Sequence, residues 1–404
     1  MFKKLIATAL VGAAALAAAA PARAADDIPV AVIAPLTGPW ARTGKLIANG
    51  AQMAIDDINA AGGIKALGGA KLRLAVGDAG DSPDKARNAA QRLLADEPNL
   101  VAGSGAWASH LTLAVTEVTE RANLPWFTLS FSDQITSRGF KYIFQMSPTG
   151  PAQADMILPV IMDMAKAAGD APKTVGVITD NTPAPTSILA KMRESGFKAN
   201  GLELVADEVF TPPLSDATSM VQQVRRARPD WLFMPPSVLQ DNVLLLQKLT
   251  ELGLSRDQLP VVGSGAQLTV PEALNVAEPE ELEGLMSVLV SWPAAEHVDI
   301  VKRYSERFNE PWMTQDAIAA YGDMMVIKEA LEAAGAADRV KVAEAIRKMD
   351  VTGGIGSFYG GNTVKFDEAG HRLGASLVMI QWQNGRPELI YPAERATAKV
   401  HWKN

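Results

Sequence analysis

Short apolar runs alternate with longer amphipathic stretches along most of the chain. Val30–Ala34 is an apolar run without alternation, which is typical of a strand covered on both faces. In the stretch 44–61 apolar residues recur at three- and four-residue steps and two glycines follow, which predicts a helix that ends there. The loop between them, LTGPWARTG at 36–44, carries Trp40. Because ligands of open parallel sheets lie beyond the carboxyl ends of the strands, we expect this loop at a binding crevice.

The same alternation continues in two series, which are separated by the Pro/Gly-rich segment SPTGP at 147–151. In the first series the expected elements are strands at 71–76, 100–102 and 125–129, and helices at 83–95 and 109–121. In the second series they are helices at 152–168, 186–195, 216–227 and 239–252, and strands at 174–179, 202–210, 231–234 and 258–262. Repeated strand–helix units are typical of doubly wound parallel sheets, so two series predict two α/β lobes.

Each series contains the triplet Gly-Ser-Gly close to the end of an expected strand, at 103–105 and at 263–265. Two interpretations of these triplets stay open. Their backbone amides can face a ligand, or the glycines serve only to make tight turns.

Ser109 and two tryptophans are candidate binding residues of the first series. Ser109 begins the expected helix 109–121, where it can cap the helix or, with the free amides of the first turn, hold an anion such as a carboxylate. Trp40 and Trp107 lie in loops at strand ends, where their flat apolar rings can line a pocket. Trp231 opens a strand and is expected in the core or at a domain boundary.

Composition predicts an exported chain of two domains. The chain has 404 residues, 48% of them hydrophobic, which is long for a single core. Two lysines precede the Ala/Leu-rich run 5–20, and Ala22-Arg23-Ala24 fits a cleavage site, so residues 1–24 are interpreted as a signal peptide. The alternative, a membrane anchor, is disfavoured because the run is shorter than the roughly 20 apolar residues of a span.

Charge and cysteine content exclude several partners. Cleavage removes three cations and leaves 35 Lys+Arg against 45 Asp+Glu, a net charge of −10 on the mature chain; such a chain is not expected to bind nucleic acid. The sequence has no cysteine, which excludes disulfides, thiolate metal sites and a lipidated amino-terminal cysteine. We therefore expect a protein that is free in the periplasm.

The sequence contains no complete motif for catalysis or cofactor binding. The stretch 103–108 satisfies G-x-G-x-x-[GA], but no Asp or Glu closes the next strand, where the ribose hydroxyls need an acceptor, which disfavours dinucleotide binding. The nucleophile motif G-x-S-x-G fails because Ala102 and Val262 replace its first glycine. The four histidines, His110, His297, His371 and His401, are too scattered for a zinc site. We expect no metal, no cofactor and no enzyme activity, and His110 is expected to be solvated or to cap a helix.

Four motifs together resemble one protein family. They are PLTGPWARTG at 35–44 with DINAAGGI at 57–64, GDAGDSPDKARNAAQRLL at 77–94, GSGAWASHLTLAV at 103–115 and VKFDEAGHR at 364–372. In this order and at these separations they are similar to motifs of the type I periplasmic solute-binding proteins of ABC transporters, in the branched-chain amino-acid-binding (Leu/Ile/Val-binding) family. The resemblance covers nearly the whole mature chain.

The resemblance implies a fold and its domain boundaries. The fold class is α/β, with two doubly wound parallel-sheet lobes joined by a three-segment hinge. Residues 25–148 and 286–356 would form lobe 1, and residues 149–285 and 357–404 would form lobe 2.

The resemblance also implies a function. The chain would be the extracytoplasmic component that captures a small carboxylate-bearing ligand between its lobes and delivers it, as a monomer, to the permease subunits of an ABC transporter. Residues that match the family's site, together with loop residues placed beside it, form the expected ligand-binding set: Trp40, Thr43, Trp107, Ala108, Ser109, Ser130, Phe131, Asn181, Thr186, Ser237, Ser264 and Gln267. Ser109 and the loop at Ser130 and Phe131 match positions that hold the ligand's carboxylate in the family.

The second lobe departs from the amino-acid-binding pattern. Where the family places a carboxylate for the ligand's ammonium, after the strand ending at Val262, this chain has Gly263–Gln267. A buried ammonium without an anionic partner is costly, so a branched-chain or other amino acid and an amine-free aromatic or organic acid both stay open as ligands. The alternatives to a transport receptor are an exported α/β enzyme, which would need a nucleophile and base or a metal cluster, and a ligand-binding module for a sensory partner.

Overall fold

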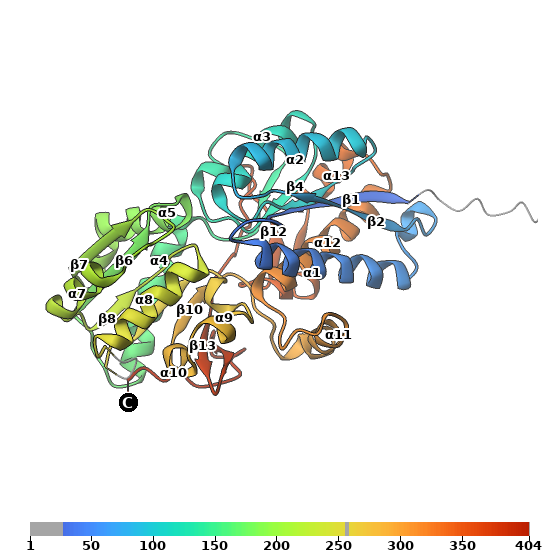
Figure 1. Cartoon of the computed structure of the whole chain (residues 1–404). Helices are drawn as coiled ribbons and strands as arrows, with labels where there is room; N and C mark the ends of the chain where they lie inside the picture. The colour runs from blue at the N-terminus through green and yellow to red at the C-terminus, as the bar shows by residue number, and fades with distance from the viewer. Residues whose placement is uncertain (1–26, 255–257, 404) are drawn as a thin grey trace, which may run out of the picture.

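The computed structural model describes residues 27–254 and 258–403. These residues form two lobes, and each lobe is built around one β-sheet (Figure 1). The expected signal peptide at 1–24 lies outside the described residues. The expectation of two doubly wound α/β lobes is confirmed. Among the described helices, none is both long and apolar enough to cross a membrane.

The first lobe is a five-stranded parallel sheet in the order β2-β1-β3-β4-β5. Its strands are β1 (Ile28–Ala34), β2 (Leu72–Asp78), β3 (Gly103–Gly105), β4 (Trp126–Thr128) and β5 (Ile143–Gln145). Its helices are α1 (Ala41–Ala60), α2 (Pro83–Asp96), α3 (Ser109–Arg121), α12 (Gln315–Ala334) and α13 (Arg339–Arg347). Side chains of α1 and α12 share one core with one face of the sheet, and those of α2 and α3 share another core with the opposite face.

The second lobe is a seven-stranded sheet in the order β14-β13-β10-β9-β8-β6-β7. Its strands are β6 (Thr174–Asp180), β7 (Glu203–Phe210), β8 (Trp231–Phe233), β9 (Val261–Ser264), β10 (Met286–Leu289), β13 (Val378–Gln383) and β14 (Arg386–Tyr391). Its helices are α4 (Gly150–Ala167), α5 (Pro183–Lys191), a π turn at Met192–Gly196, α6 (Phe197–Ala199), α7 (Thr218–Ala227), α8 (Leu239–Glu251), α9 (Ala273–Val276) and α10 (Pro279–Leu282). Helices α4 and α5 pack on one face and α7 and α8 on the other.

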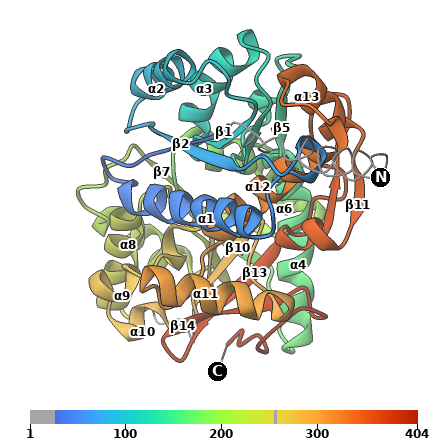
Figure 2. The same cartoon turned by 90° about the vertical axis from the view of Figure 1, so that its right-hand side faces the viewer.

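The remaining elements connect the lobes or lie beside them. Helix α11 (Val298–Phe308) lies alongside α1 (Figure 2), where Arg303 forms an ion pair with Asp57 at 2.6 Å. Strands β11 (Asp350–Thr352) and β12 (Thr363–Lys365) form an antiparallel pair. Short 3₁₀ turns lie at Lys65–Leu67, Asp133–Ile135, Gln267–Thr269, Ala295–His297 and Gly354–Phe358.

The predicted position of the strand at 100–102 is wrong: the strand begins three residues later, because the Gly-Ser-Gly triplet is itself the strand β3. Gly103 pairs with Ala31 and lies against the ring of Trp126; a Cβ at position 103 would meet that ring at 2.4 Å. The triplet is therefore glycine-rich because of close packing inside the sheet. In the second lobe, the first two residues of the triplet likewise end β9.

The lobe boundaries differ from the expected ones for reasons of strand pairing and packing. Strand β10 pairs with β9 and β13 in the second sheet, although 286–356 is expected in the first lobe. Phe358 and Phe366 belong to the core of the first lobe, although 357–404 is expected in the second. The second and third crossings between the lobes therefore come later in the chain than expected, and the antiparallel strands β13 and β14, with β14 at the edge, complete the second sheet.

Candidate ligand-binding site

One pocket lies between the lobes, where the strand order of each sheet reverses. In the first sheet β1 is flanked by β2 and β3, and the loops after β1 and β3 carry Trp40 and Trp107. In the second sheet β6 is flanked by β7 and β8, and the loops after β6 and β8 carry Thr182 and Ser237. Such reversals leave a crevice at the carboxyl ends of the strands. The two crevices face one another and form one site.

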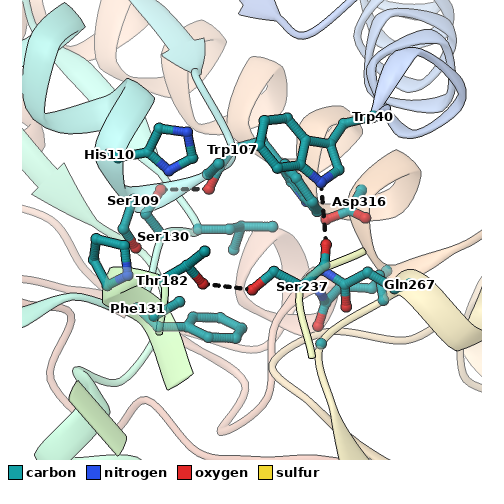
Figure 3. Close-up of a pocket in the computed structure, with 17 residues that line it drawn as sticks. Trp40, Trp107, Ser109, His110, Ser130, Phe131, Thr182, Ser237, Gln267 and Asp316 are labelled. Atoms are coloured by element: carbon teal, nitrogen blue, oxygen red, sulfur yellow. Dashed lines mark hydrogen bonds between the residues drawn. The ribbon is translucent and has the colours of Figure 1, made fainter. Parts of the chain in front are cut away.

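Seventeen residues from both lobes line this pocket (Figure 3). They are Trp40, Trp107, Ala108, Ser109, His110, Leu129, Ser130, Phe131, Thr182, Pro183, Ala184, Ser237, Gly265, Ala266, Gln267, Gln315 and Asp316. The space between them, including its open rim, is about 540 Å³. Mostly apolar walls with a few polar groups are typical of small-molecule sites, and the walls of this pocket fit that description.

The loop that carries Trp107 has a strained backbone. Gly105, Ala106 and Trp107 have φ values of 116°, 66° and 59°, and positive φ is unfavourable for residues with a Cβ. Two hydrogen bonds hold the loop: the Ala106 amide donates to the Ile33 carbonyl at 2.6 Å, and the Ser130 hydroxyl donates to the Trp107 carbonyl at 2.6 Å. Strain of this kind gathers at functional sites.

Helix α3 points its amino terminus at the pocket. Its N-cap residue is Ala108, and within the described chain no side chain caps the helix. The Leu111 amide donates to the Ala108 carbonyl at 3.0 Å, and the amides of Ser109 and His110 before it, which have no carbonyl partner inside the helix, are left to bind an anion. The hydroxyl of Ser109 accepts a hydrogen bond from the Ser132 amide at 3.3 Å and keeps its own proton to donate.

Aromatic rings form the wall next to this helix. The ring centroid of Trp40 lies 5.7 Å from that of Trp107 and 5.4 Å from that of His110. The indole N–H of Trp40 donates to the Ser237 carbonyl at 3.1 Å, which joins the two lobes directly. Burial lowers the pKa of His110 below its ordinary value of 6.5, so the ring is neutral at pH 7 and extends the apolar wall.

Asp316 is the carboxylate of the pocket wall. It belongs to the first turn of α12, and its side chain is 2% exposed. No donor among the described residues has hydrogen-bonding geometry to either carboxylate oxygen. Burial raises the pKa of Asp316 to about 7, and the nearby Gln315 side chain and Trp107 indole offset only part of that effect.

Most of the chain matches one known protein family. A model of the family described as periplasmic binding protein matches residues 27–387. The chain belongs to the periplasmic binding protein family. A Leu/Ile/Val-binding protein homolog 7 from Brucella melitensis is 30% identical over 412 residues, covering 99% of each chain. The family consists of solute-binding proteins rather than enzymes.

Solved structures share the fold of this periplasmic binding protein. The branched-chain amino acid transporter substrate-binding protein LivJ from Streptococcus pneumoniae, in complex with isoleucine, is 21% identical with a TM-score of 0.77, covering 91% of this chain and all of its own. An ABC-transporter solute-binding protein from Rhodopseudomonas palustris, in complex with 3,4-dihydroxybenzoic acid, is 22% identical with a TM-score of 0.72, covering 90% of this chain and 95% of its own.

Eight of the twelve expected ligand-binding residues line the pocket of this binding protein. They are Trp40, Trp107, Ala108, Ser109, Ser130, Phe131, Ser237 and Gln267. Ser130 has a further role, since its hydroxyl donates to Trp107 and also contacts the hydroxyls of Thr112 and Thr128. Its side chain therefore supports the strained loop.

The other four expected residues lie outside the pocket. Thr43 is buried inside α1. Asn181 turns its amide to the Thr211 hydroxyl at 2.7 Å, and Thr186 is exposed on α5. Ser264 ends β9 one residue before the pocket wall begins. Each is a few positions from a lining residue, because the sequence shows which loop approaches the pocket more clearly than which side chain points into it.

Several lining residues are not in the expected set. They are His110, Leu129, Thr182, Pro183, Ala184, Gly265, Ala266, Gln315 and Asp316. His110 was expected to be solvated or capping, and instead it packs its ring against Trp40. Among the described residues no group of three or more His, Cys, Asp or Glu side chains could hold a metal ion.

Proposed function

We propose that this periplasmic binding protein is the extracytoplasmic solute-binding component of an ABC transporter. It captures a small solute with a carboxylate group between its lobes and delivers it to the permease. One observation carries the proposal: a single pocket takes its walls from the strand ends of both sheets, with the free amino terminus of α3 on one side. A site that is built from both lobes is completed by closure and opened by hinge bending.

The carboxylate end of the solute is assigned to the α3 terminus. Amides of the first turn and the Ser109 hydroxyl donate to it, and the positive end of the helix dipole favours the negative charge. The rings of Trp40 and Trp107 cover the body of the solute, and Ser237 and Gln267 contact it from the second lobe. The isoleucine and the 3,4-dihydroxybenzoic acid of the two structural neighbours both carry a carboxyl group, which supports this choice of ligand class.

Export and delivery belong to the same proposal. Residues 1–24 act as a cleaved signal peptide that directs the chain to the periplasm, where it works as a monomer. The closed protein then presents its solute to the permease subunits, and ATP hydrolysis takes place on another polypeptide.

A binding screen with purified mature protein tests this function. Amino acids, aromatic acids and short dicarboxylates are screened by thermal shift, because a ligand at a hundred times its Kd adds about 2.7 kcal/mol to the stability of the folded state. Hits are confirmed by isothermal titration calorimetry, and the solute is recovered intact after hours of incubation. Chemical conversion of the solute, or no binding by any carboxylate, would refute the proposal.

Matched serine variants test the carboxylate end. Replacing Ser109 and Ser130 together by alanine should weaken binding at least about tenfold, because one hydroxyl that donates to the solute and one that holds the Trp107 loop are lost. Ser82 is the control: it also starts a helix, capping α2 through the Lys85 amide, but it lies outside the pocket. The Ser82→Ala variant should lose a little stability and keep its affinity.

A further inference from the structure

Asp316 is a buried carboxylate that the fold leaves without a partner. It is the second residue of α12 and lines the pocket. Figure 3 shows it across the pocket from Ser109, on the side of Trp40 and Gln267. No donor among the described residues has hydrogen-bonding geometry to either oxygen, and the nearby Gln315 side chain and Trp107 indole offset only part of the cost of burying its charge. Buried ionisable groups are normally paired, so this carboxylate requires an explanation.

Helix capping does not explain Asp316. Where an acid caps a helix in this protein it accepts a backbone hydrogen bond: Asp338 accepts from the Lys341 amide at the start of α13, at 3.0 Å. Asp316 accepts no such bond. Asp180, a buried carboxylate just behind the pocket wall, is saturated by the amide and hydroxyl of Thr182 and by the amide of Ser237. Among the acids of residues 27–254 and 258–403, Asp316 is the one that lines the pocket with neither oxygen in hydrogen-bonding geometry to a donor.

The charges of the pocket indicate what the missing partner is. No lysine or arginine is among the residues found to line it. An amine-free acid would place a second negative charge beside Asp316 with no cation to balance either one, and like charges in a water-poor site repel strongly. A solute that carries an ammonium group as well as a carboxylate would pair its cation with Asp316 and its anion with the α3 terminus.

We propose that Asp316 binds the ammonium group of the solute, so that the protein selects zwitterionic amino acids over amine-free acids of the same shape. This inference rests on the proposed function and deepens it. It resolves the choice that the sequence leaves open: the anionic partner that the loop 263–267 lacks is supplied from the first lobe by α12.

Ionisation of Asp316 gives the proposal a pH signature. The empty site holds this carboxyl half protonated near pH 7. An ammonium binds the ionised form, so the affinity for an amino acid should fall about tenfold from pH 8 to pH 6, whereas an amine-free acid binds the protonated form and should show the opposite trend. The titratable groups nearest to it are His110 on α3, whose pKa burial lowers, and Asp180 at the end of β6, whose oxygens accept three hydrogen bonds.

Calorimetry with matched solutes tests the assignment. The probes are the twenty common L-amino acids, with 4-methylpentanoate, 3-phenylpropanoate and benzoate as amine-free acids, each at pH 6 and pH 8. The Asp316→Asn variant should bind the best amino acid at least about 30-fold more weakly, as expected when one partner of a buried charge pair is removed. It should bind amine-free acids as well as the wild type does, or better, and lose the pH dependence.

The control variant is Asp241→Asn. Asp241 is also a buried acid with one unsatisfied oxygen, but it lies on α8 outside the pocket, so its replacement should leave the amino-acid affinity within about twofold.

Four results would overturn the assignment. Preference of the wild type for amine-free acids, or equal loss of affinity for both solute classes in Asp316→Asn, would refute it and leave the proposed function standing. Amino-acid affinity that does not rise with pH in the wild type would also refute it, without any need for the variant to fold. If none of the probes binds, the proposed function fails and the assignment fails with it.

Discussion

Replacing Asp316 by asparagine should stabilise the ligand-free protein at pH 8. Burial raises the pKa of this carboxyl from 3.8 to about 7, so ionising it costs more in the folded chain than in the unfolded chain. A shift of about three units corresponds to about 4 kcal/mol above both pKa values, because each unit is about 1.4 kcal/mol. A buried asparagine that lacks partners costs about 1–3 kcal/mol, which leaves a net gain of about 1–3 kcal/mol.

The sign of the pH dependence follows from proton binding. Between pH 3.8 and about 7 the folded chain keeps the Asp316 proton and the unfolded chain loses it. The contribution of Asp316 to stability is therefore fully present below pH 3.8 and disappears as the pH rises through about 7. From pH 5 to pH 8 the wild type should lose about 3 kcal/mol that Asp316→Asn does not lose. Asp323, whose pKa burial raises to about 6, contributes a slope of the same sign, but it is present in both proteins and cancels in the comparison.

Urea unfolding of both proteins without ligand, followed by tryptophan fluorescence at pH 5 and pH 8, measures these free energies. The two curves of stability against pH should converge toward low pH and separate toward high pH, with the variant above the wild type. Parallel curves, or a variant that is less stable than the wild type at pH 8, would show that Asp316 is not held unpaired in the empty pocket. A saturating amino acid should then reverse the order, since only the wild type has the carboxylate for its ammonium.

Two further substitutions test the contacts between the lobes. Trp40→Phe keeps an aromatic ring in the pocket wall but removes the N–H that donates to the Ser237 carbonyl. Calorimetry should find a Kd for the solute about fivefold higher, because one hydrogen bond is worth about 1 kcal/mol. An unchanged Kd would contradict this prediction. Arg42→Ala removes the cation that pairs with Glu272 and with Glu310, whose side chain is 6% exposed. Urea unfolding should show that the free energy of unfolding falls by about 1–3 kcal/mol, which is less than for a fully buried pair. A fall below about 0.5 kcal/mol would refute this prediction.

The sequence predicts those parts of the site that local patterns determine. Helix α3 begins at Ser109 and ends at Arg121, as the apolar spacing indicates. The loops that carry Trp40 and Trp107 lie at strand ends and reach the pocket. Both results follow from periodicity within one strand–helix unit, where the residues that decide the structure are neighbours in the chain.

Features that depend on distant contacts could not be predicted in this way. Strand β3 begins three residues later than expected because Gly103 packs beneath Trp126, a contact between strands that the local pattern does not contain. Ser130 looks like a residue that meets the ligand, yet its hydroxyl supports the Trp107 loop. Asp316 is hardest to find, since an acid in the first turn of a helix is ordinary. Its place in the pocket wall is set by segments far apart in the chain that meet there.

The strained loop at Trp107 and the unpaired Asp316 face the same pocket, and both destabilise the empty protein. A non-glycine residue at positive φ costs about 1–3 kcal/mol, and the buried carboxylate costs more at neutral pH. Such costs persist only where the surrounding structure enforces them, and they concentrate where function needs a preorganised partner. A zwitterion bound between them would meet amides aimed at its carboxylate and an anion already stripped of water. Much of the desolvation that binding requires is therefore already complete in the empty protein, so the solute gains an ion pair without having to dehydrate Asp316.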